Sequence, residues 1–489
     1  MTRSRLNMIT AGVMLSLFLA SMEGTVVATA MPTIVAQLGG LAIYSWVFAI
    51  YLLTATTTVP IYGKLSDLYG RKRVYVASMA LFILGSVLCA QAQTMEQLIL
   101  FRAMQGIGAG GVLPLAFTII GQLFSLEQRA RMQGLFSGVW GVSAVIGPLI
   151  GGFLVDQVSW RWVFLINVFP GLLAVGLVWF AWRDARPGEA KPVAVDYPGA
   201  VLLTLGVLAL LLGMEELPAP LSWALLAAAL ALFAILVFVE RRAADPILPF
   251  HLFRDRLYTV SLIHGFLSGW AVFGSLNYVP LFVQAVLGTS ATQAGITLTP
   301  MSIAWTVASI LAGQLLLRLS YRTLALIGMT ILTAGAFLMS TIGVNASQAW
   351  IMVYLGMMGT GMGLSVPAFL IAVQSTVPLQ ELGAATSTLQ FSRNMGSTLG
   401  VSVLGVVLSS RLASSLITAG LDPAIVSLNA LLDPVASQTA AIEGSLRGAL
   451  AVAIAGLFCI AFSAALAGLI AAIFAPRGKI SQMTKYNDR

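Results

Sequence analysis

Glu23, one carboxylate within an apolar stretch, is the residue of this sequence best placed to do chemistry inside a membrane. Apolar residues flank it from Met8 to Ala30, about 23 residues, which at ~1.5 Å per residue is enough to cross a bilayer. An ionisable group at that depth is costly unless it is paired, so such residues are functional-site hypotheses. Glu23 is the only acidic residue that our expected spans place within the hydrocarbon. We therefore predict that it takes up and releases a proton.

A second intramembrane charge, Arg102, lies on a separate apolar segment at a similar depth. Glu23 lies eight residues before Met31, about 12 Å from the outer boundary, and Arg102 lies six residues after Glu96, about 9 Å from it. A neighbouring guanidinium favours the ionised carboxylate, whereas apolar surroundings favour the protonated form. Movement between two such environments would load and unload a proton. The alternative is that Arg102 extends outward to the membrane surface.

The composition places these residues in a membrane protein. Of the 489 residues, 58% are hydrophobic and only 9% are charged, which excludes a soluble fold of this length. The apolar segment after Arg3 and Arg5 is too long for a signal peptide, so we expect a retained first helix. Cys89 and Cys459 both lie in apolar stretches, which supports neither a disulfide framework nor a metal site.

The apolar segments predict an all-α polytopic membrane protein with fourteen transmembrane helices. Their expected cores are 8–30, 43–62, 74–91, 97–120, 132–155, 162–182, 197–214, 222–239, 257–284, 293–316, 323–343, 349–373, 384–410 and 447–474. Most of the 26 Lys and Arg residues lie in the termini and in the even-numbered connections. The positive-inside rule therefore predicts that both termini are cytoplasmic. This topology accounts for the net charge of +8, and we expect no nucleic-acid partner.

A weak internal repeat predicts two related six-helix bundles. The pattern G-x-G-x-G-x-x-x-P occurs at 106–114 and 359–367, and G-x-x-x-G occurs at 147–151 and 396–400. Duplicated halves around a midplane site are typical of alternating-access carriers. The expected units are an N-terminal bundle 1–182, a cytoplasmic linker 183–196, inserted helices seven and eight 197–239, a cytoplasmic loop 240–256, a C-terminal bundle 257–474 and a cytoplasmic tail 475–489.

The C-terminal bundle contains one long external segment, 411–446, in which Pro423 and Pro434 separate apolar and polar patches. Long loops in compact folds are often functional. This segment is either an amphipathic lid that lies on the membrane or a disordered loop.

Several motifs resemble those of a known family. Residues 63–73 (GKLSDLYGRKR) resemble the loop between helices two and three of the major facilitator superfamily, and Arg102-x-x-Gln105-Gly106-x-Gly108 is similar to its helix-four motif. Residues 141–152 (GVSAVIGPLIGG) resemble the helix-five motif of the drug:proton antiporters. Residues 23–32 and 160–167 resemble their helix-one motif and the start of their helix six, although the helix-one acid is commonly Asp. With fourteen predicted spans, the resemblance is to the fourteen-helix drug:proton antiporter branch.

The resemblance implies that the loop at 63–73 is a cytoplasmic latch between the two halves. The latch residues that it implies are Gly63, Asp67, Gly70, Arg71 and Arg129. Asp67 and Arg71 are expected to reach the start of the thirteenth helix, near 383–385, where the positive helix end favours an aspartate. The alternative is a turn whose basic residues only set the topology.

The resemblance also implies an external gate in the fifth helix. Its residues are Gly141, Gly147, Pro148, Gly151 and Gly152. A kink and small surfaces would let this helix pack closely against a helix of the other half, the tenth by topology. The alternative is an ordinary kink in a membrane helix.

The candidate residues of a substrate cavity are Gln105, Trp270, Phe273, Asn277, Tyr278 and Arg393. Four of them recur at three- to four-residue spacing on the ninth helix, where they either line an aromatic pocket or pack against neighbours. Arg393 lies about 13 Å inside the thirteenth helix with no acidic residue at its depth. It either faces a water-filled cavity or extends toward the cytoplasm. His264 is either a group that titrates near neutral pH or, as is more common for a lone His near a helix start, a packing group.

These features predict a proton-coupled antiporter, not an enzyme, that exports small amphipathic or lipophilic compounds, as in multidrug efflux. No Walker nucleotide motif is present, so we expect a proton gradient as the energy source, without a cofactor or metal. The expected partners are an amphipathic small molecule, protons and the bilayer, for a monomer in the cell (cytoplasmic or inner) membrane. The alternatives are an exporter of an endogenous metabolite or lipid, and a membrane sensor or scaffold that transports nothing.

Overall fold

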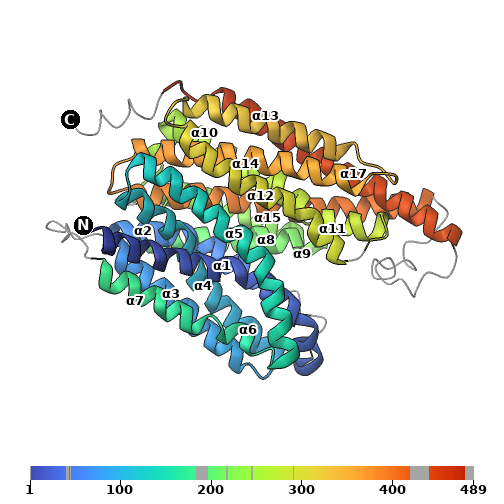
Figure 1. Ribbon diagram of the computed structural model, residues 1–489, viewed down its shortest axis with the longest axis horizontal. Helices are drawn as coiled ribbons and strands as arrows, with labels where there is room; N and C mark the ends of the chain where they lie inside the picture. Colours follow the sequence, from blue (N-terminus) through green and yellow to red (C-terminus); the bar gives the residue numbers. More distant parts are fainter. Residues whose placement is uncertain are drawn as a thin grey trace.

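The computed structural model describes residues 2–39, 43, 46–182, 196–215, 219–243, 246–289, 291–418 and 440–478. All regular elements within these ranges are helices, and the long ones lie side by side in an elongated bundle (Figure 1). Twelve helices in the described part are long and apolar enough to cross a membrane. The predicted all-helical membrane fold is therefore confirmed.

The described helices form three groups along the chain. The first group comprises α1 (Arg3–Leu38), α2 (Trp46–Tyr69), α3 (Arg71–Gln91), α4 (Met95–Leu123), α5 (Leu126–Gln157), α6 (Trp162–Leu165) and α7 (Val168–Ala181). Next come α8 (Tyr197–Glu215) and α9 (Pro220–Glu240), which pack against each other. The last group comprises η2 (Leu252–Arg254), α10 (Arg256–Leu276), α11 (Val279–Leu281), η3 (Phe282–Val286), α12 (Ala291–Leu315), α13 (Tyr321–Ser340), α14 (Gln348–Thr376), α15 (Leu382–Thr418) and α17 (Ala440–Ile473).

The first and last groups of helices pack in the same pattern. In the first group, α4 packs against α2 and α3, and α1 packs against α5 and α7. In the last group, α14 packs against α12 and α13, and α10 packs against α15 and α17. The most extensive contacts between the groups, α5 with α12 and α2 with α15, also correspond to each other. Two related bundles that face each other would produce this arrangement.

The repeated glycine pattern explains the packing of the two central helices, α4 and α14. The first and third glycines of each pattern face α2 or α12, and the middle glycine faces α3 or α13. A Cβ on Gly108 would lie 2.7 Å from Cα of Phe82, and a Cβ on Gly361 would lie 2.5 Å from Cβ of Leu332. Glycine therefore lets each central helix approach two neighbours closely.

The pair α8–α9 lies against the place where the two groups meet. Leu203, Val207 and Leu211 of α8 form a small apolar core with Leu53 of α2 and Met395 of α15. This contact gives the pair a defined position although it has no counterpart in the repeat.

Some sequence predictions concern segments that the structure describes only in part. Helices α5 and α15, of 32 and 37 residues, were counted in the fourteen predicted spans but are not among the twelve candidate spans. In the predicted external segment 411–446, α15 continues to Thr418 and α17 begins at Ala440, so both helices extend into it. Residues 419–439, most of the linker 183–196 and most of the tail 475–489 lie outside the described residues.

Candidate functional site

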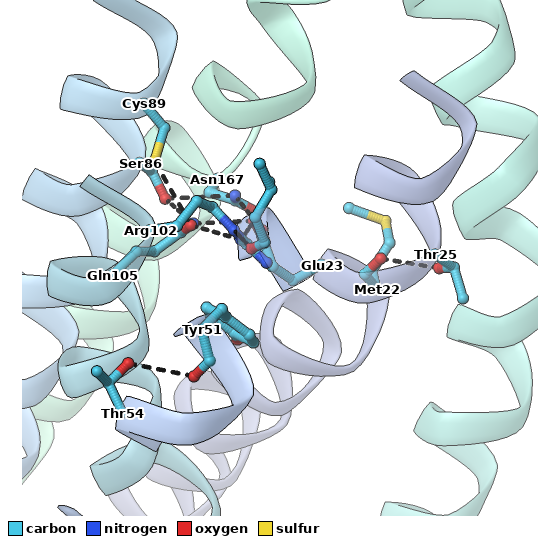
Figure 2. Close-up of polar contacts among 11 residues, drawn as sticks. Met22, Glu23, Thr25, Tyr51, Thr54, Ser86, Cys89, Arg102, Gln105 and Asn167 are labelled. Carbon is cyan, nitrogen blue, oxygen red and sulfur yellow. Dashed lines mark hydrogen bonds and ion pairs between the residues drawn. The ribbon is translucent and has the colours of Figure 1, made fainter. Parts of the chain in front are cut away.

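Glu23 lies within α1 and points between α3, α4 and the break between α6 and α7 (Figure 2). Its Oε1 lies 2.7 Å from Nη1 of Arg102, and both side chains are only 1% exposed. Each charge compensates the other in a place where an unpaired charge would be strongly unfavourable. The structure thus brings Arg102 to Glu23, and the alternative that Arg102 extends to the membrane surface is wrong.

Two amide side chains complete the surroundings of the carboxylate. Gln105 Nε2 donates to Glu23 Oε1 at 3.0 Å, and Asn167 Nδ2 donates to Oε2 at 2.7 Å. Gln105 also accepts from Arg102 at 2.7 Å and donates to Ser86 at 2.7 Å. Both oxygens of the Glu23 carboxylate therefore accept hydrogen bonds from neighbouring side chains.

Helix α2 holds the other side of the Arg102 guanidinium. Arg102 Nε donates to the carbonyl of Val47 at 3.0 Å, and its Cζ lies 4.0 Å from the centre of the Tyr51 ring. A cation over an aromatic ring is attracted to it, most strongly where water is absent. Arg102 therefore has favourable contacts with α2 in addition to its ion pair with Glu23.

Local features of three helices explain why these polar groups meet. Gly85 of α3 allows a close approach to α4, because a Cβ there would lie 2.5 Å from Cα of Gln105. This approach brings Gln105 within hydrogen-bond distance of Ser86. Asn167 lies between the end of α6 and the start of α7, and its side chain points inward to Glu23.

Sequence reasoning assigned some of these residues differently. Gln105 was predicted to line a substrate cavity, whereas it is buried against Glu23. Asn167 and Ser86 were not predicted as site residues. The available signal was that both are uncharged polar residues within apolar helices, and such residues commonly bond across to neighbouring helices.

The predicted latch residues lie where α2 ends and α15 begins. Asp67 accepts hydrogen bonds from the backbone N–H of Gly383 at 3.0 Å and of Ala384 at 2.7 Å. Arg71 lies 3.4 Å from Asp67 Oδ1 and donates to the carbonyl of Leu379 at 2.5 Å. Asp67 thus caps the start of α15 from another helix and satisfies N–H groups that have no partner within α15.

The glycines of the latch permit this contact. A Cβ on Gly63 would collide with the Ser387 side chain and would lie 2.7 Å from the carbonyl oxygen of Gly383. Gly70 immediately precedes α3 and has a φ of 89°, a backbone conformation that favours glycine. Arg129 donates to Phe124 O at 2.9 Å and reaches Gln374 O of α14 at 3.5 Å, so it also links the two groups.

The predicted gate residues of α5 face two different helices. Gly141 faces α12, where a Cβ would lie 3.6 Å from Thr306 Oγ1. A Cβ on Gly147 would collide with Thr25 Oγ1, and one on Gly151 with Thr29 Oγ1, both in α1. Since a helix turns ~100° per residue, positions four apart share a face, whereas position 141 lies on another. The expectation that the whole motif packs against the other half is therefore wrong for Gly147 and Gly151.

The remaining two gate residues complete this description. Nothing lies within 4 Å of a Cβ added to Gly152. The side chain of Pro148 is outside the described part of the structure, although α5 is helical through this position.

Gly151→Ala should lower the thermal unfolding temperature of the purified protein by several degrees, whereas Gly152→Ala should not. The added methyl group at 151 meets Thr29 Oγ1 and lies 3.0 Å from the carbonyl of Val26, so α1 and α5 must move apart. The two variants add the same group to adjacent positions of one helix. Equal unfolding temperatures for both would contradict the close packing of α1 on α5.

The predicted aromatic stripe on the ninth helix does not converge on one cavity. Trp270 lies against α15 at Gly400, and Phe273 packs against Trp305 of α12 with 6.0 Å between ring centres and 59° between ring planes. Asn277 is exposed and bonds to its own helix, and Tyr278 donates to the carbonyl of Val401 at 2.8 Å. The packing alternative therefore describes these four residues better.

Two hollows lie in the last group of helices. One is a groove of about 720 Å³ between α12 and α14, with an almost wholly apolar lining that includes Ile303, Val307 and Met352. The other is a cavity of about 30 Å³ among α10, α14 and α15, lined in part by His264, Gln390 and Arg393. Arg393 is thus the one residue from the predicted substrate-cavity set that lines either hollow.

The structure has the features of a membrane transporter: two matching helix bundles, a buried ion pair inside one of them, and a polar contact that joins the bundles at one end. The family model described as Major Facilitator Superfamily matches residues 13–401. The chain belongs to the Major Facilitator Superfamily.

Named relatives and solved structures agree with this membership. The chain is 39% identical over 442 residues to multidrug transporter protein MdtP of Bacillus subtilis, covering 89% of this chain and 81% of the relative. It is also 39% identical to multidrug resistance protein 3 of Bacillus subtilis, covering 81% and 78%. The fold is similar to that of the proton:xylose symporter XylE, with a TM-score of 0.62 at 14% identity over 98% of each chain.

Proposed function

We propose that this protein is a proton-coupled antiporter that exports small amphipathic or lipophilic compounds, and that Glu23 carries the proton. The observation that carries this proposal is the buried Glu23–Arg102 ion pair, because a titratable acid within membrane-spanning helices is energetically costly and therefore marks a functional site by default. Two relatives named for multidrug transport or resistance support the type of cargo. The apolar groove between α12 and α14 has the size of sites that bind lipophilic compounds.

Glu23 alternates between two charge states in this scheme. In the described conformation it is buried and accepts hydrogen bonds from Arg102, Gln105 and Asn167. A protonated carboxyl group needs an acceptor, and Oδ1 of Asn167 has no hydrogen-bond partner among the described residues. A flip of the Asn167 amide, which exchanges the positions of Nδ2 and Oδ1, would therefore let it accept from the protonated carboxyl group. Proton exchange itself requires a conformation in which water reaches Glu23.

The latch provides the conformational switch of the proposed cycle. Its hydrogen bonds from Asp67 to α15 and from Arg71 to Leu379 are made while the two groups of helices touch at that end. Opening the cytoplasmic side would break them, so the bound proton and the substrate must favour the open arrangement enough to offset their loss.

The proposed topology has fourteen spans with both termini in the cytoplasm of a cell or inner membrane. It adds α5 and α15 to the twelve candidate spans, since each is more than 30 residues long and packs along a candidate span, α1 or α10. The pair α8–α9 is then an insertion between two six-helix bundles. The monomer is the working unit, and the proton gradient is the energy source without a resident cofactor or metal.

Purified protein in proteoliposomes tests this proposal. Ethidium added to vesicles with an imposed pH gradient should move against its own gradient and dissipate the pH difference, as reported by a trapped pH-sensitive dye. A protonophore should stop both movements, and protein-free vesicles provide the control. Ethidium movement that is unaffected by the protonophore would contradict proton coupling. The absence of flux for ethidium and for other lipophilic compounds would favour an endogenous cargo or a sensor.

A further inference from the structure

A small polar cavity lies in the last group of helices, away from Glu23. It has a volume of about 30 Å³ and lies between α10, α14 and α15. This space suits a group of a few atoms, such as one or two water molecules or a carboxylate. None of the ten residues that line it is acidic, and two of them, Arg393 and His264, are basic.

Arg393 supplies the cavity with a permanent positive charge. Its Nη2 donates to Gln390 Oε1 at 2.6 Å, which is a neutral partner. Among the ion pairs of the described residues none involves Arg393, in contrast to Arg102, which has Glu23. A guanidinium within a transmembrane bundle is unfavourable without an opposite charge. The cavity beside it is therefore suited to an anion.

His264 adds a second group with unused hydrogen-bonding capacity. The residue is 2% exposed, its ring lies 4.7 Å from that of Phe369, and its Nε2 has no partner among the described residues. A buried polar atom without a partner is uncommon, and it suggests a ligand or water in the adjoining space. In the tautomer with hydrogen on Nε2, His264 is a donor like Arg393.

The cavity also adjoins the contact between the two groups of helices. Leu370 lines it and packs against the apolar cores of both groups. One turn further along α14, Gln374 Nε2 donates to the carbonyl of Phe117 in α4 at 3.3 Å. Arg393 is on α15, the helix whose first N–H groups bind Asp67. A ligand here would touch surfaces that must move when the latch opens.

We infer that this cavity binds a small monovalent anionic group, the carboxylate of an exported compound, through Arg393 and His264. The protein would then select anionic and zwitterionic amphiphiles over their uncharged or purely cationic analogues. This inference rests on the proposed export function and adds a substrate class to it. Free chloride has the same charge and a similar size, so the test must separate the two sources.

Rhodamine B and its ethyl ester are a matched pair of probes for this site. Both contain the same cationic fluorophore, but only rhodamine B also carries a free carboxylate, so it is a zwitterion whereas the ester is a cation. Binding to the full-length purified protein is measured by fluorescence polarisation in chloride-free gluconate buffer. We expect rhodamine B to bind the native protein more tightly than the ester, and Arg393→Gln to weaken rhodamine B about 10- to 100-fold while leaving the ester unchanged. Arg393→Lys should retain part of the preference, and Arg411→Gln, on the same helix, should retain all of it.

The outcomes separate the inference from the proposed function. Retained ester binding shows that a variant is folded. Equal binding of the two dyes to the native protein, or an unchanged preference in Arg393→Gln, would overturn the substrate-carboxylate site.

If chloride alone then quenches tryptophan fluorescence in the native protein but not in Arg393→Gln, the anion is free chloride, and the substrate class is refuted. Proton-driven export of both dyes at equal rates would refute this inference but leave the proposed function intact, and no proton-driven export of either would refute the proposed function.

Discussion

Glu23→Gln should abolish the response of export to a pH gradient and reduce the initial rate in proteoliposomes by about 100-fold or more. The amide keeps the size of the side chain but cannot bind and release a proton. It also leaves the Arg102 charge buried without its counterion, since the two side chains are 1% exposed and 2.7 Å apart. Removing one partner of such a pair typically costs about 3–5 kcal/mol. That cost would strongly disfavour the described conformation, in which Arg102 is buried.

Two matched variants make the Glu23 result specific. Glu96→Gln makes the same chemical change at an exposed position in the first turn of α4 and should leave export at the native rate. Glu23→Asp keeps an acid that is one methylene shorter, so it should remain pH-responsive at a reduced rate. A Glu23→Gln protein that still moves protons with its substrate would eliminate Glu23 as the carrier, whatever its effect on rate.

The second large effect is expected at the latch, where Gly63→Ala should shift the protein toward a conformation that is open at that end. The new Cβ would occupy the place of the Ser387 side chain and lie 2.7 Å from the carbonyl of Gly383. Such overpacking costs about 1–3 kcal/mol, or about a 5- to 150-fold change in the population ratio. Spin labels at the exposed positions Tyr69 and Leu379 would report the distance across the latch.

The latch prediction has its own controls. Gly176→Ala adds the same methyl group in α7, where nothing lies within 4 Å, and should leave the distance distribution unchanged. Asp67→Asn should weaken the same contact by removing the charge that favours the hydrogen bonds to Gly383 and Ala384. If both residues act through one contact, the double variant should open little further than Gly63→Ala alone. Independent, additive shifts would show that they act separately.

Much of the fold could be read from the amino-acid pattern because a membrane imposes strict physical demands. Long apolar segments must form helices to satisfy their backbone groups in lipid, so the helical class follows directly. The glycine pattern at 106–110 and 359–363 was detectable as a repeat, and the structure shows that the two copies face corresponding helices of their own groups. Which neighbour each glycine would touch was not predictable, because that depends on how the helices are arranged around it.

The candidate site was predictable to the extent that charge makes a residue conspicuous. Glu23 and Arg102 were expected to meet because both are charged and lie at matching depths, and they do meet. Asn167 and Ser86 were missed because neutral polar residues are common in membrane helices. Arg393 could be singled out as a charge without a partner, but the cavity beside it and the unpartnered Nε2 of His264 appear only when three helices are assembled.

By itself, the sequence determined that the chain crosses a membrane many times, that it is built from repeated halves and that it carries an acid and a base within the bilayer. Only the tertiary structure decided that Gly147 and Gly151 pack against α1, that Gln105 and Asn167 surround Glu23, and that the aromatic stripe does not converge on one cavity. The physical reason is that transfer into lipid depends on the composition of each segment alone. Contacts between helices depend on their relative rotation and depth, which all of the neighbours set together.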